Sequence, residues 1–479
     1  MRRALLALGP VLFLLTILLN PHFGLSETAW RVAGLACWMA VWWLSAVVPL
    51  ESTALLPLVI LPLVGTRPLS EVAASYADPI IFLFLGGFLL AATLERWDLH
   101  RRFALLTVRK VGTSAPKVLL AFMLASAVAS MWISNTATAV MMLPIAMAVA
   151  VGKPSERGDA PASHSSRFPT ALMLGIAYAC SIGGVATLIG TPPNAILAGA
   201  AQELLGIEIT FAGWLLLGLT VSVPMLFACW LWLVLVFRVT GEAPGLASAL
   251  QREEAKFTTM SGGERFVLAV FALTGTAWIL RAPKIIGDLR IPGLTDVVPG
   301  LSDPMIAIAA ALVMFVVPLP RQRFATALDW DSARKVPWGI LLLFGGGLSL
   351  AAAFVSSGLS DWVGSRLAAL EGVPLPVMVF ATATVFVFLT ELTSNTATAA
   401  LGMPLMAGVA QGIGVAPLPL MVAAALAASM AFMLPVATPP NAIMFGSGAI
   451  RSRDMALAGV GLNFLAIIII TIFVSLWAL

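Results

Sequence analysis

Charged side chains are scarce in this chain of 479 residues: Asp, Glu, Lys and Arg together make up 10% of it, whereas a typical soluble protein carries about 25%. Apolar residues make up 60% of the sequence, and the mean hydropathy is +1.00. This composition excludes an ordinary soluble domain and predicts a helical protein that crosses a membrane many times. The net charge of +4 requires no nucleic-acid partner, because the excess Lys and Arg of membrane proteins collect in cytoplasmic loops.

Cysteine and histidine are also rare, with three of each. The cysteines fall within apolar runs, so they indicate neither a disulfide framework nor a metal site. The chain lacks a P-loop, which excludes a pump driven by ATP of that type. It also lacks a His-Glu-x-x-His motif and a Ser/His pair within its apolar runs, so we predict that it is not an intramembrane enzyme.

What the chain does contain is a series of apolar runs long enough to cross a membrane. Eleven of them lie at approximately 4–20, 29–48, 51–65, 79–97, 170–202, 211–237, 265–281, 304–320, 338–356, 416–449 and 455–478. The first run follows Met-Arg-Arg and resembles a signal peptide, but no clean small-x-small cleavage site follows it. We therefore interpret it as a retained first helix.

Two further apolar runs, 118–151 and 373–412, are too long for one helix and too short for two crossings with a loop. Each has Ser-Asn-Thr at its middle. Two half-crossings that meet at this tripeptide explain both features, so we predict two re-entrant hairpins.

The positive-inside rule supports this arrangement. With the N-terminus in the cytoplasm, twenty-one Lys and Arg fall on the cytoplasmic side and six outside. Five crossings separate the hairpins, so the second enters from the opposite face. The predicted fold is an all-α polytopic membrane protein with about eleven transmembrane helices plus two re-entrant hairpins in an inverted repeat, its C-terminus outside. We expect a cytoplasmic interfacial helix in 240–264 and an external loop at 282–303.

The most informative motifs are two strings that each occur twice. Ser-Asn-Thr-Ala-Thr-Ala fills 134–139 and 394–399, and Thr-Pro-Pro-Asn-Ala-Ile fills 191–196 and 438–443. The proline pairs cannot continue a helix, so the runs that contain them are predicted to be broken helices. A break leaves carbonyls that suit a small hard cation and N–H groups that suit an anion.

Neutral side chains at the hairpin tips can bind both a cation and an anion. Oxygens that can ligate Na⁺ belong to Ser134, Asn135, Ser394 and Asn395. Donors for a carboxylate or sulfate belong to Asn135, Thr136, Asn395 and Thr396. No Lys or Arg lies within 118–152, 168–237 or 367–450. A bound anion would therefore be neutralised by helix dipoles and co-bound cations, which is the physical basis of symport.

A single Ser-Asn-Thr in a span is usually a helix-packing element, and a single Pro-Pro is usually a turn. Duplication of both strings in inverted halves favours a transport site instead. Glu391 is the one carboxylate inside either hairpin. It is either a cation or proton site, or a residue at a helix end that faces water or a partner group.

These paired strings resemble those of the divalent anion:sodium symporter family, the Na⁺-coupled carriers of di- and tricarboxylates and sulfate, over essentially the whole chain. The resemblance implies an ion-transporter-superfamily-like homodimer, in which a transport domain moves like an elevator against a scaffold. The compact loops suggest a bacterial protein, so we expect it in a bacterial inner membrane. It implies scaffold elements in 1–116 and, with linking helices, in 204–372; transport elements in 117–203 and 373–450; and a last helix in 451–479.

The resemblance also implies at least two Na⁺ sites and one site for a dianion. The first Na⁺ site would use Ser130, Ser134, Asn135 and the backbone near Gly190. The second would use Thr390, Ser394, Asn395 and the backbone near Ala437. The substrate would be met by Asn135, Thr136, Thr191, Asn395, Thr396, Thr438 and Pro439. Thr390 stands where the first half has Ser130, and its retained hydroxyl predicts tuned affinity, not loss.

We therefore expect a sodium-coupled importer of C4-dicarboxylates such as succinate, malate and fumarate. The alternatives are a transporter of sulfate or another divalent oxyanion, a sodium-independent dicarboxylate exchanger and, from another class, a passive anion channel. A channel would also have broken helices along its pore, but it would need no duplicated cation ligands.

Overall fold

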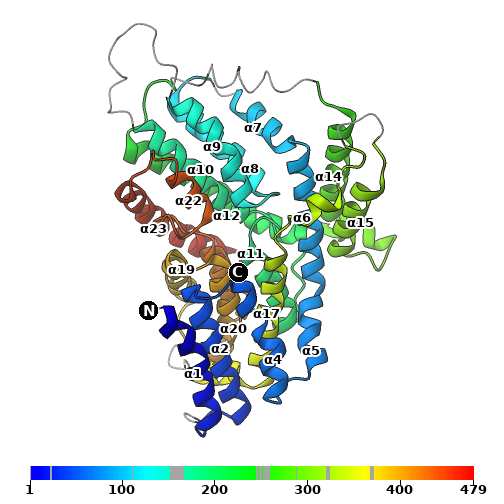
Figure 1. Cartoon of the computed structure of the whole chain (residues 1–479), viewed down its shortest axis with the longest axis vertical. Coiled ribbons are helices and arrows are strands. Elements are labelled where there is room, and N and C mark those ends of the chain that lie inside the picture. The colour runs from blue at the N-terminus through cyan, green and yellow to red at the C-terminus, as the bar shows by residue number, and fades with distance from the viewer. Residues whose placement is uncertain are drawn as a thin grey trace.

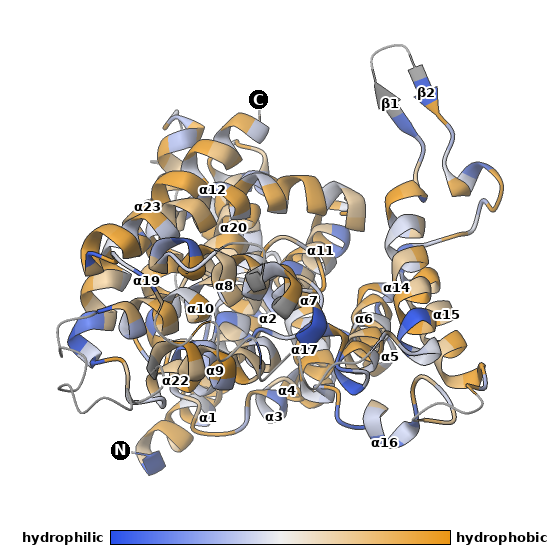
Figure 2. Ribbon diagram, turned by 90° about the horizontal axis from the view of Figure 1, so that it is seen from above, coloured by the Kyte–Doolittle hydropathy of each residue, from blue (hydrophilic) through white to orange (hydrophobic). Residues whose placement is uncertain are grey.

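The computed structural model describes residues 2–21, 24–109, 112–151, 167–243, 259–286, 289–319, 324–366 and 372–478, together with Leu246 and Gln251. Within these residues the chain is almost entirely helical (Figure 1), which confirms the predicted all-α class. Hydrophobic residues predominate along the helices, as expected for segments that face lipid or one another (Figure 2).

The helices of the first half run from α1 to α12. Their bounds are α1 Arg2–Leu18, α2 Glu27–Ser45, α3 Leu50–Thr53, α4 Leu56–Leu63, α5 Leu69–Ala74, η1 Ser75–Ala77, α6 Pro79–Arg96, α7 Leu99–Arg109, α8 Ala115–Ser130, α9 Asn135–Val151, α10 Phe168–Gly184, α11 Pro192–Leu205 and α12 Phe211–Phe237.

The second half begins at α14 and includes the two strands. Its elements are α14 Gly262–Leu280, β1 Lys284–Ile286, β2 Leu289–Ile291, η2 Leu294–Asp296, α15 Asp303–Val316, α16 Trp330–Ala333, α17 Trp338–Ser356, α18 Leu359–Arg366, α19 Leu375–Leu392, α20 Asn395–Gly412, α21 Pro417–Ala428, α22 Pro439–Phe445 and α23 Ser452–Trp477.

Six helical segments of the described chain are long and apolar enough to cross a membrane by length and composition. Further apolar helices of the described chain are shorter, with 10–17 residues. The first apolar run forms the single helix α1, packed against α2. The predicted run 51–65 does not form one continuous helix. It divides into α3 and α4.

Both long apolar runs divide at the Ser-Asn-Thr tripeptide, as predicted. α8 ends at Ser130 and α9 begins at Asn135, while α19 ends at Leu392 and α20 begins at Asn395. The Ser134 hydroxyl accepts a hydrogen bond from the Ala137 N–H at 3.2 Å. A serine that satisfies a free N–H of the first turn is a favourable way to begin a helix at this point.

Both proline-bearing runs are broken helices, also as predicted. Residues 185–191 separate α10 from α11, and residues 429–438 separate α21 from α22. In each pair the second helix begins at the first proline, where a missing N–H costs nothing because the first turn has no internal acceptor for it.

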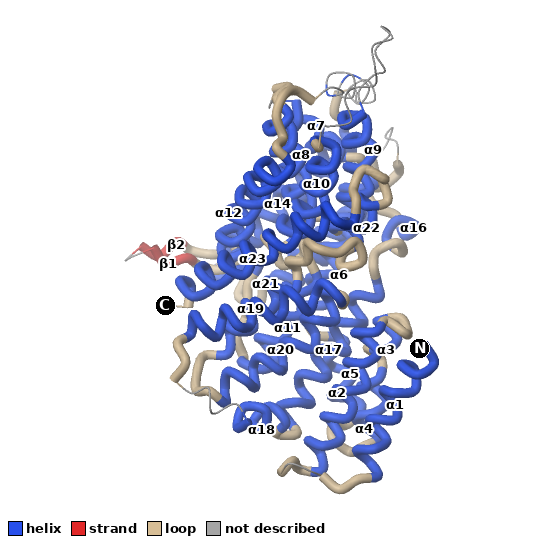
Figure 3. Tube along the Cα trace, turned by 90° about the vertical axis from the view of Figure 1, so that its left-hand side faces the viewer, coloured by secondary structure: helices blue, strands red, loops and turns tan. Residues whose placement is uncertain are grey.

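The two halves interlock around these breaks. α22 packs against α9 and α10 of the first half, and α11 packs against α20 and α21 of the second (Figures 1 and 3). Each hairpin therefore contacts the broken helix of the other half. This packing brings the two Ser-Asn-Thr tips and the two Thr-Pro-Pro segments into one region.

The predicted external loop at 282–303 contains a short antiparallel β-hairpin of β1 and β2, which projects away from the helices beyond α14 (Figure 2). The interfacial helix predicted in 240–264 falls largely outside the described residues. α14 itself begins with a capping box, in which Ser261 and Glu264 satisfy each other's backbone N–H groups.

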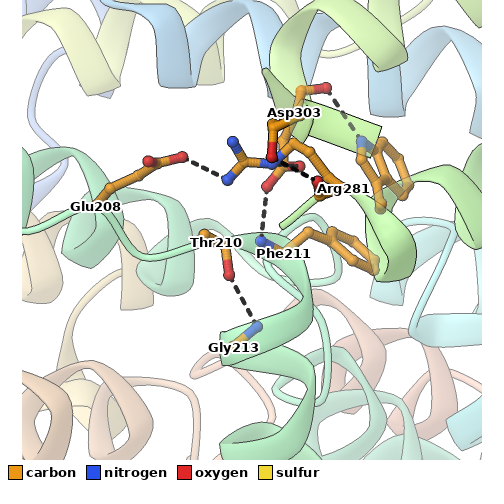
Figure 4. A network of polar contacts seen from close by, with 8 residues as sticks. Glu208, Thr210, Phe211, Gly213, Arg281 and Asp303 are labelled. Carbon is orange, nitrogen blue, oxygen red and sulfur yellow. Dashed lines mark hydrogen bonds and ion pairs between the residues drawn. The ribbon is translucent and has the colours of Figure 1, made fainter. Parts of the chain in front are cut away.

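A buried ion pair joins α14 and α15 to the linker between α11 and α12 (Figure 4). Arg281 Nε lies 2.6 Å from Asp303 Oδ1, and Arg281 Nη2 lies 2.6 Å from Glu208 Oε1. The other Asp303 oxygen accepts a hydrogen bond from the Phe211 N–H at 2.8 Å. Asp303 is 3% exposed, so its charge is balanced by these partners and not by water.

Candidate transport site

The four repeated motifs surround one cavity of about 480 Å³, which we call the central cavity. Its lining residues are Trp43, Leu44, Ala46, Leu50, Phe88, Ser134, Asn135, Thr136, Ile189, Gly190, Thr191, Pro192, Pro337, Ile340, Leu392, Thr393, Ser394, Asn395, Thr396, Val436, Ala437, Thr438, Pro439 and Pro440. The described lining includes no Lys, Arg, Asp or Glu. Polar groups are supplied by the motifs and apolar walls by α2, α6 and α17.

Eleven of the predicted site residues line this cavity. They are Ser134, Asn135, Thr136, Gly190, Thr191, Ser394, Asn395, Thr396, Ala437, Thr438 and Pro439. The other two, Ser130 and Thr390, are fully buried and bond to the tip asparagines. The structure thus brings all the predicted residues together. Their contacts with cation and substrate stay predictions.

Neutral oxygens converge at the first hairpin tip. The Ser130 hydroxyl donates to Asn135 Oδ1 at 2.5 Å. A Cβ placed on Gly184 would lie 2.6 Å from Asn135 Oδ1 and 3.0 Å from the Gly190 carbonyl oxygen. Gly184 therefore allows the asparagine and the broken helix to approach closely. Hydroxyl, amide and carbonyl oxygens form the type of ligand set that suits a small hard cation.

The second tip has a related but different arrangement. Thr390 Oγ1 lies 2.7 Å from Asn395 Oδ1 and 2.7 Å from the Ala428 carbonyl oxygen. Alanines, Ala431 and Ala437, stand in register with Gly184 and Gly190 of the first half. The two clusters are therefore similar in donor chemistry and different in the space around their oxygens.

Sequence reasoning assigned no role to the asparagines of the Thr-Pro-Pro-Asn strings. Asn194 Nδ2 lies 3.3 Å, 3.1 Å and 2.7 Å from the carbonyl oxygens of Gly184, Val185 and Thr187. Asn441 Nδ2 lies 3.1 Å from the carbonyl oxygens of both Ala431 and Leu434. Each asparagine thus satisfies carbonyls that the break leaves without a helical partner.

A second cavity of about 570 Å³, which we call the vestibule, adjoins the central cavity because both are lined by Phe88, Ser134 and Pro337. Its charged lining residues are Glu95, Arg96, Asp329, Asp331 and Lys335. Arg96 Nη2 lies 2.7 Å from Asp329 Oδ2, and its guanidinium lies 4.1 Å from the centre of the Phe324 ring. Polar and charged residues near α16 thus lie next to the cavity that the motifs line.

Paired hairpins and broken helices around a neutral polar cavity define a class: the helical membrane transporters built from repeats. The sequence matches the sodium:sulfate symporter transmembrane region over residues 3–479. The chain therefore belongs to the sodium:sulfate symporter group of the divalent anion:sodium symporter family, whose members are transporters and not enzymes.

Sequence relatives agree with this assignment. The chain is 41% identical over 475 residues to the sodium-dependent dicarboxylate transporter SdcS of Staphylococcus saprophyticus, covering 98% of this chain and 90% of the relative. It is 40% identical over 477 residues to the protein of that name from Staphylococcus aureus strain USA300, with the same coverage.

Two solved structures share the fold at low sequence identity. The Alcanivorax borkumensis YdaH transporter superposes with a TM-score of 0.57 at 14% identity, covering 85% of this chain and 87% of that one. Neisseria gonorrhoeae MtrF superposes with a TM-score of 0.56 at 12% identity, covering 86% and 83%. At these identities the likeness concerns the fold alone.

Proposed function

We propose that the chain is a secondary active symporter that imports C4-dicarboxylates with Na⁺. The observation that carries this proposal is the central cavity, where both hairpin tips and both broken helices meet without a charged residue in the described lining. The relatives at 40–41% identity are named as sodium-dependent dicarboxylate transporters, which supports Na⁺ as the coupling ion and a dicarboxylate as the substrate.

Charge balance explains why cation and anion would bind together. A dicarboxylate moved into a cavity whose described lining has no Lys or Arg would lose its hydration without gaining a counter-charge. Two Na⁺ ions held by the neutral oxygens at Asn135 and Asn395 would supply that charge, and hydroxyl and amide donors would orient the carboxylates. Uptake of the anion would then require the cation.

The cavity also suits a small substrate. Its volume of about 480 Å³ lies in the range of about 300–1,000 Å³ that is usual for small-molecule sites. Thr136, Thr191, Thr396 and Thr438 place hydroxyl-bearing residues on both halves, as a substrate with a carboxylate at each end would need. Apolar residues such as Phe88 and Val436 are positioned for contact with its carbon chain.

The vestibule indicates the side of the membrane that the central cavity faces. It lies beside loops rich in Lys and Arg, which the positive-inside rule assigns to the cytoplasm. The position of the vestibule beside the central cavity therefore supports a cytoplasm-facing state, from which substrate would be released. We place the N-terminus in the cytoplasm and the C-terminus outside on the same charge argument.

We further propose that the protein is a homodimer in the bacterial inner membrane and works as an elevator. Hairpins and broken helices at 117–203 and 373–450 would move together against the helices of 1–116 and 204–372. The interlocked packing of α9 with α22 and of α11 with α20 supports one moving unit, because each half of the site is attached to the other half.

The test is uptake of labelled succinate by proteoliposomes with an inward Na⁺ gradient, compared with choline in place of Na⁺. We expect saturable uptake that requires Na⁺ and that malate and fumarate compete for. Uptake that is independent of Na⁺ would refute symport, and competition by sulfate but not by dicarboxylates would refute the substrate. Counterflow distinguishes a carrier from a channel, because a channel cannot drive accumulation of label by exchange.

A further inference from the structure

Glu391 is an acidic residue buried at the end of α19, with 3% of its surface exposed. It adjoins Thr390 but does not line the central cavity. No Lys or Arg occurs between residues 367 and 450. A carboxylate in this position must be stabilised by hydrogen bonds, since burial of an unpartnered charge is very costly.

Four N–H groups surround this carboxylate. Oε1 accepts from the backbone N–H of Phe432 at 2.6 Å and of Met433 at 2.8 Å, and from Asn463 Nδ2 at 2.9 Å. Oε2 accepts from the backbone N–H of Leu434 at 3.1 Å. Consecutive backbone N–H groups form an anion-binding concavity, here filled by the protein's own side chain.

These contacts join three elements that are separated along the chain. Glu391 belongs to α19, the three consecutive N–H groups belong to the break between α21 and α22, and Asn463 belongs to α23. The same break carries Ala437 and Thr438, which line the central cavity. The bonds of Glu391 therefore attach the second hairpin to the second broken helix.

The first half has a different connection at the matching place. Met131 follows Ser130 as Glu391 follows Thr390. The tie between hairpin and break there runs from Thr187 Oγ1 to the Met131 carbonyl oxygen at 2.5 Å. Between hairpin and break, one neutral hydrogen bond of the first half thus corresponds to three bonds to the Glu391 carboxylate in the second, and a fourth bond to that carboxylate comes from α23, so the described parts of the two halves are not equivalent.

We propose that Glu391 is a positioning residue for the second cation site. Its carboxylate fixes residues 432–434 and so holds the Ala437 segment at the central cavity that Asn395 also lines. Its negative charge stabilises a cation in the neighbouring oxygen cluster, although the carboxylate itself is occupied by N–H donors. This inference rests on the proposed function and assigns to the second Na⁺ site a fixed charge that the first site lacks.

The proposal is tested with Glu391→Gln, which removes the charge and leaves one oxygen to accept hydrogen bonds. The matched control is Met131→Gln, which places the same side chain at the corresponding position of the first hairpin, where the tie uses the backbone carbonyl. Three measurements are made on the full-length protein: amide hydrogen exchange in detergent, the melting temperature in detergent, and the dependence of succinate uptake on Na⁺ concentration.

We expect exchange of the amides of 432–434 to become at least about tenfold faster in Glu391→Gln, while the first break, 185–187, keeps its wild-type rate. We expect the Na⁺ concentration for half-maximal uptake to rise about tenfold or more with a lower Hill coefficient. Met131→Gln should leave both quantities unchanged. A residue with a purely structural role would lower the melting temperature without this selective change in Na⁺ activation.

Double mutants show which of the two proposed cation sites Glu391 affects. In the background of Glu391→Gln, the further loss from Asn395→Ala should be much smaller than in wild type, whereas the loss from Asn135→Ala should be nearly unchanged. Equal additivity with both asparagines, or wild-type exchange at 432–434, would overturn the proposal. If Glu391→Gln does not fold, Glu391→Asp gives the test instead, because its side chain is one methylene shorter and cannot reach the N–H groups of 432–434 as Glu391 does, so faster exchange at these residues is expected.

The outcomes also separate this proposal from the proposed function. A wild-type protein without Na⁺-dependent succinate uptake would refute the function, and the cation-positioning role would fall with it. The exchange measurement would then still decide whether Glu391 fixes the break. Na⁺-dependent uptake that Glu391→Gln leaves at wild-type Na⁺ affinity would refute the positioning role alone.

Discussion

The substitution Gly184→Ala adds one methyl group and tests the proposed Na⁺ site at the first hairpin tip. Gly184 lies at the end of α10, where a Cβ would lie 2.6 Å from Asn135 Oδ1 and 3.0 Å from the Gly190 carbonyl oxygen. Ordinary contact begins at 3.4 Å. In Gly184→Ala the methyl is therefore about 0.8 Å too close to an oxygen that is proposed to ligate Na⁺, so that oxygen, the break or both must move.

The size of the effect follows from packing. An extra methyl in a well-packed interior costs about 1–3 kcal/mol. If that cost falls on the cation-bound arrangement, Na⁺ binding weakens by roughly 5- to 150-fold, because about 1.4 kcal/mol corresponds to a factor of ten. A cost that falls on the fold as a whole would instead lower the melting temperature and leave the Na⁺ affinity of the folded protein unchanged.

The assay is the Na⁺ dependence of succinate uptake in proteoliposomes, together with the melting temperature in detergent. Gly275→Ala in α14 is the control, because its Cβ would meet no atom closer than 4.0 Å. We expect the control to behave as wild type and Gly184→Ala to require more Na⁺. Wild-type Na⁺ activation in a folded Gly184→Ala protein would refute the placement of the first cation beside Asn135 Oδ1 and the Gly190 carbonyl.

Three further predictions concern the tips, the breaks and the ion pair. Asn135→Ala and Asn395→Ala should each weaken Na⁺ dependence and succinate affinity together, and wild-type values of both would remove that residue from the site. Asn194→Ala and Asn441→Ala leave carbonyls of the breaks unsatisfied, at about 1–3 kcal/mol each, so a clear drop in melting temperature is expected, and no drop would show that the breaks hold without them. Arg281→Gln leaves Asp303 buried without a cation and should lower the free energy of unfolding by about 3–5 kcal/mol. The side chain of Glu208 is 62% exposed, so Glu208→Gln should lower it by less than about 1 kcal/mol. Equal losses of melting temperature would refute the buried Arg281–Asp303 pair as the main contribution.

Local chemistry made much of the fold predictable. The division of both long apolar runs followed from the conflict between their length and the thickness of a bilayer. The breaks at Pro192 and Pro439 followed from the missing N–H groups of proline. Both effects are properties of one continuous segment of the chain, so no knowledge of tertiary contacts was needed.

Other local features were missed or were not predictable in this way. The division of the run 51–65 into α3 and α4 was missed, although Pro57 in the first turn of α4 is a signal of the same kind as Pro192. The β-hairpin at Lys284–Ile291 is too short for its periodicity to be distinguished from that of a loop. Asn194 and Asn441 were visible as parts of a duplicated string, and their exact repetition was the signal that could have assigned them a role.

The sequence by itself determined the class of protein, the position of the breaks and the residue types of the site, because hydropathy, proline geometry and donor chemistry are properties of short segments. Only the tertiary structure decided which segments meet. The packing of α9 with α22 and of α11 with α20 brings tips that lie in different halves of the chain to one cavity. The same packing places the Glu391 carboxylate on the N–H groups of the second break. Contacts between segments so distant depend on the shapes of whole helices, which no local pattern encodes.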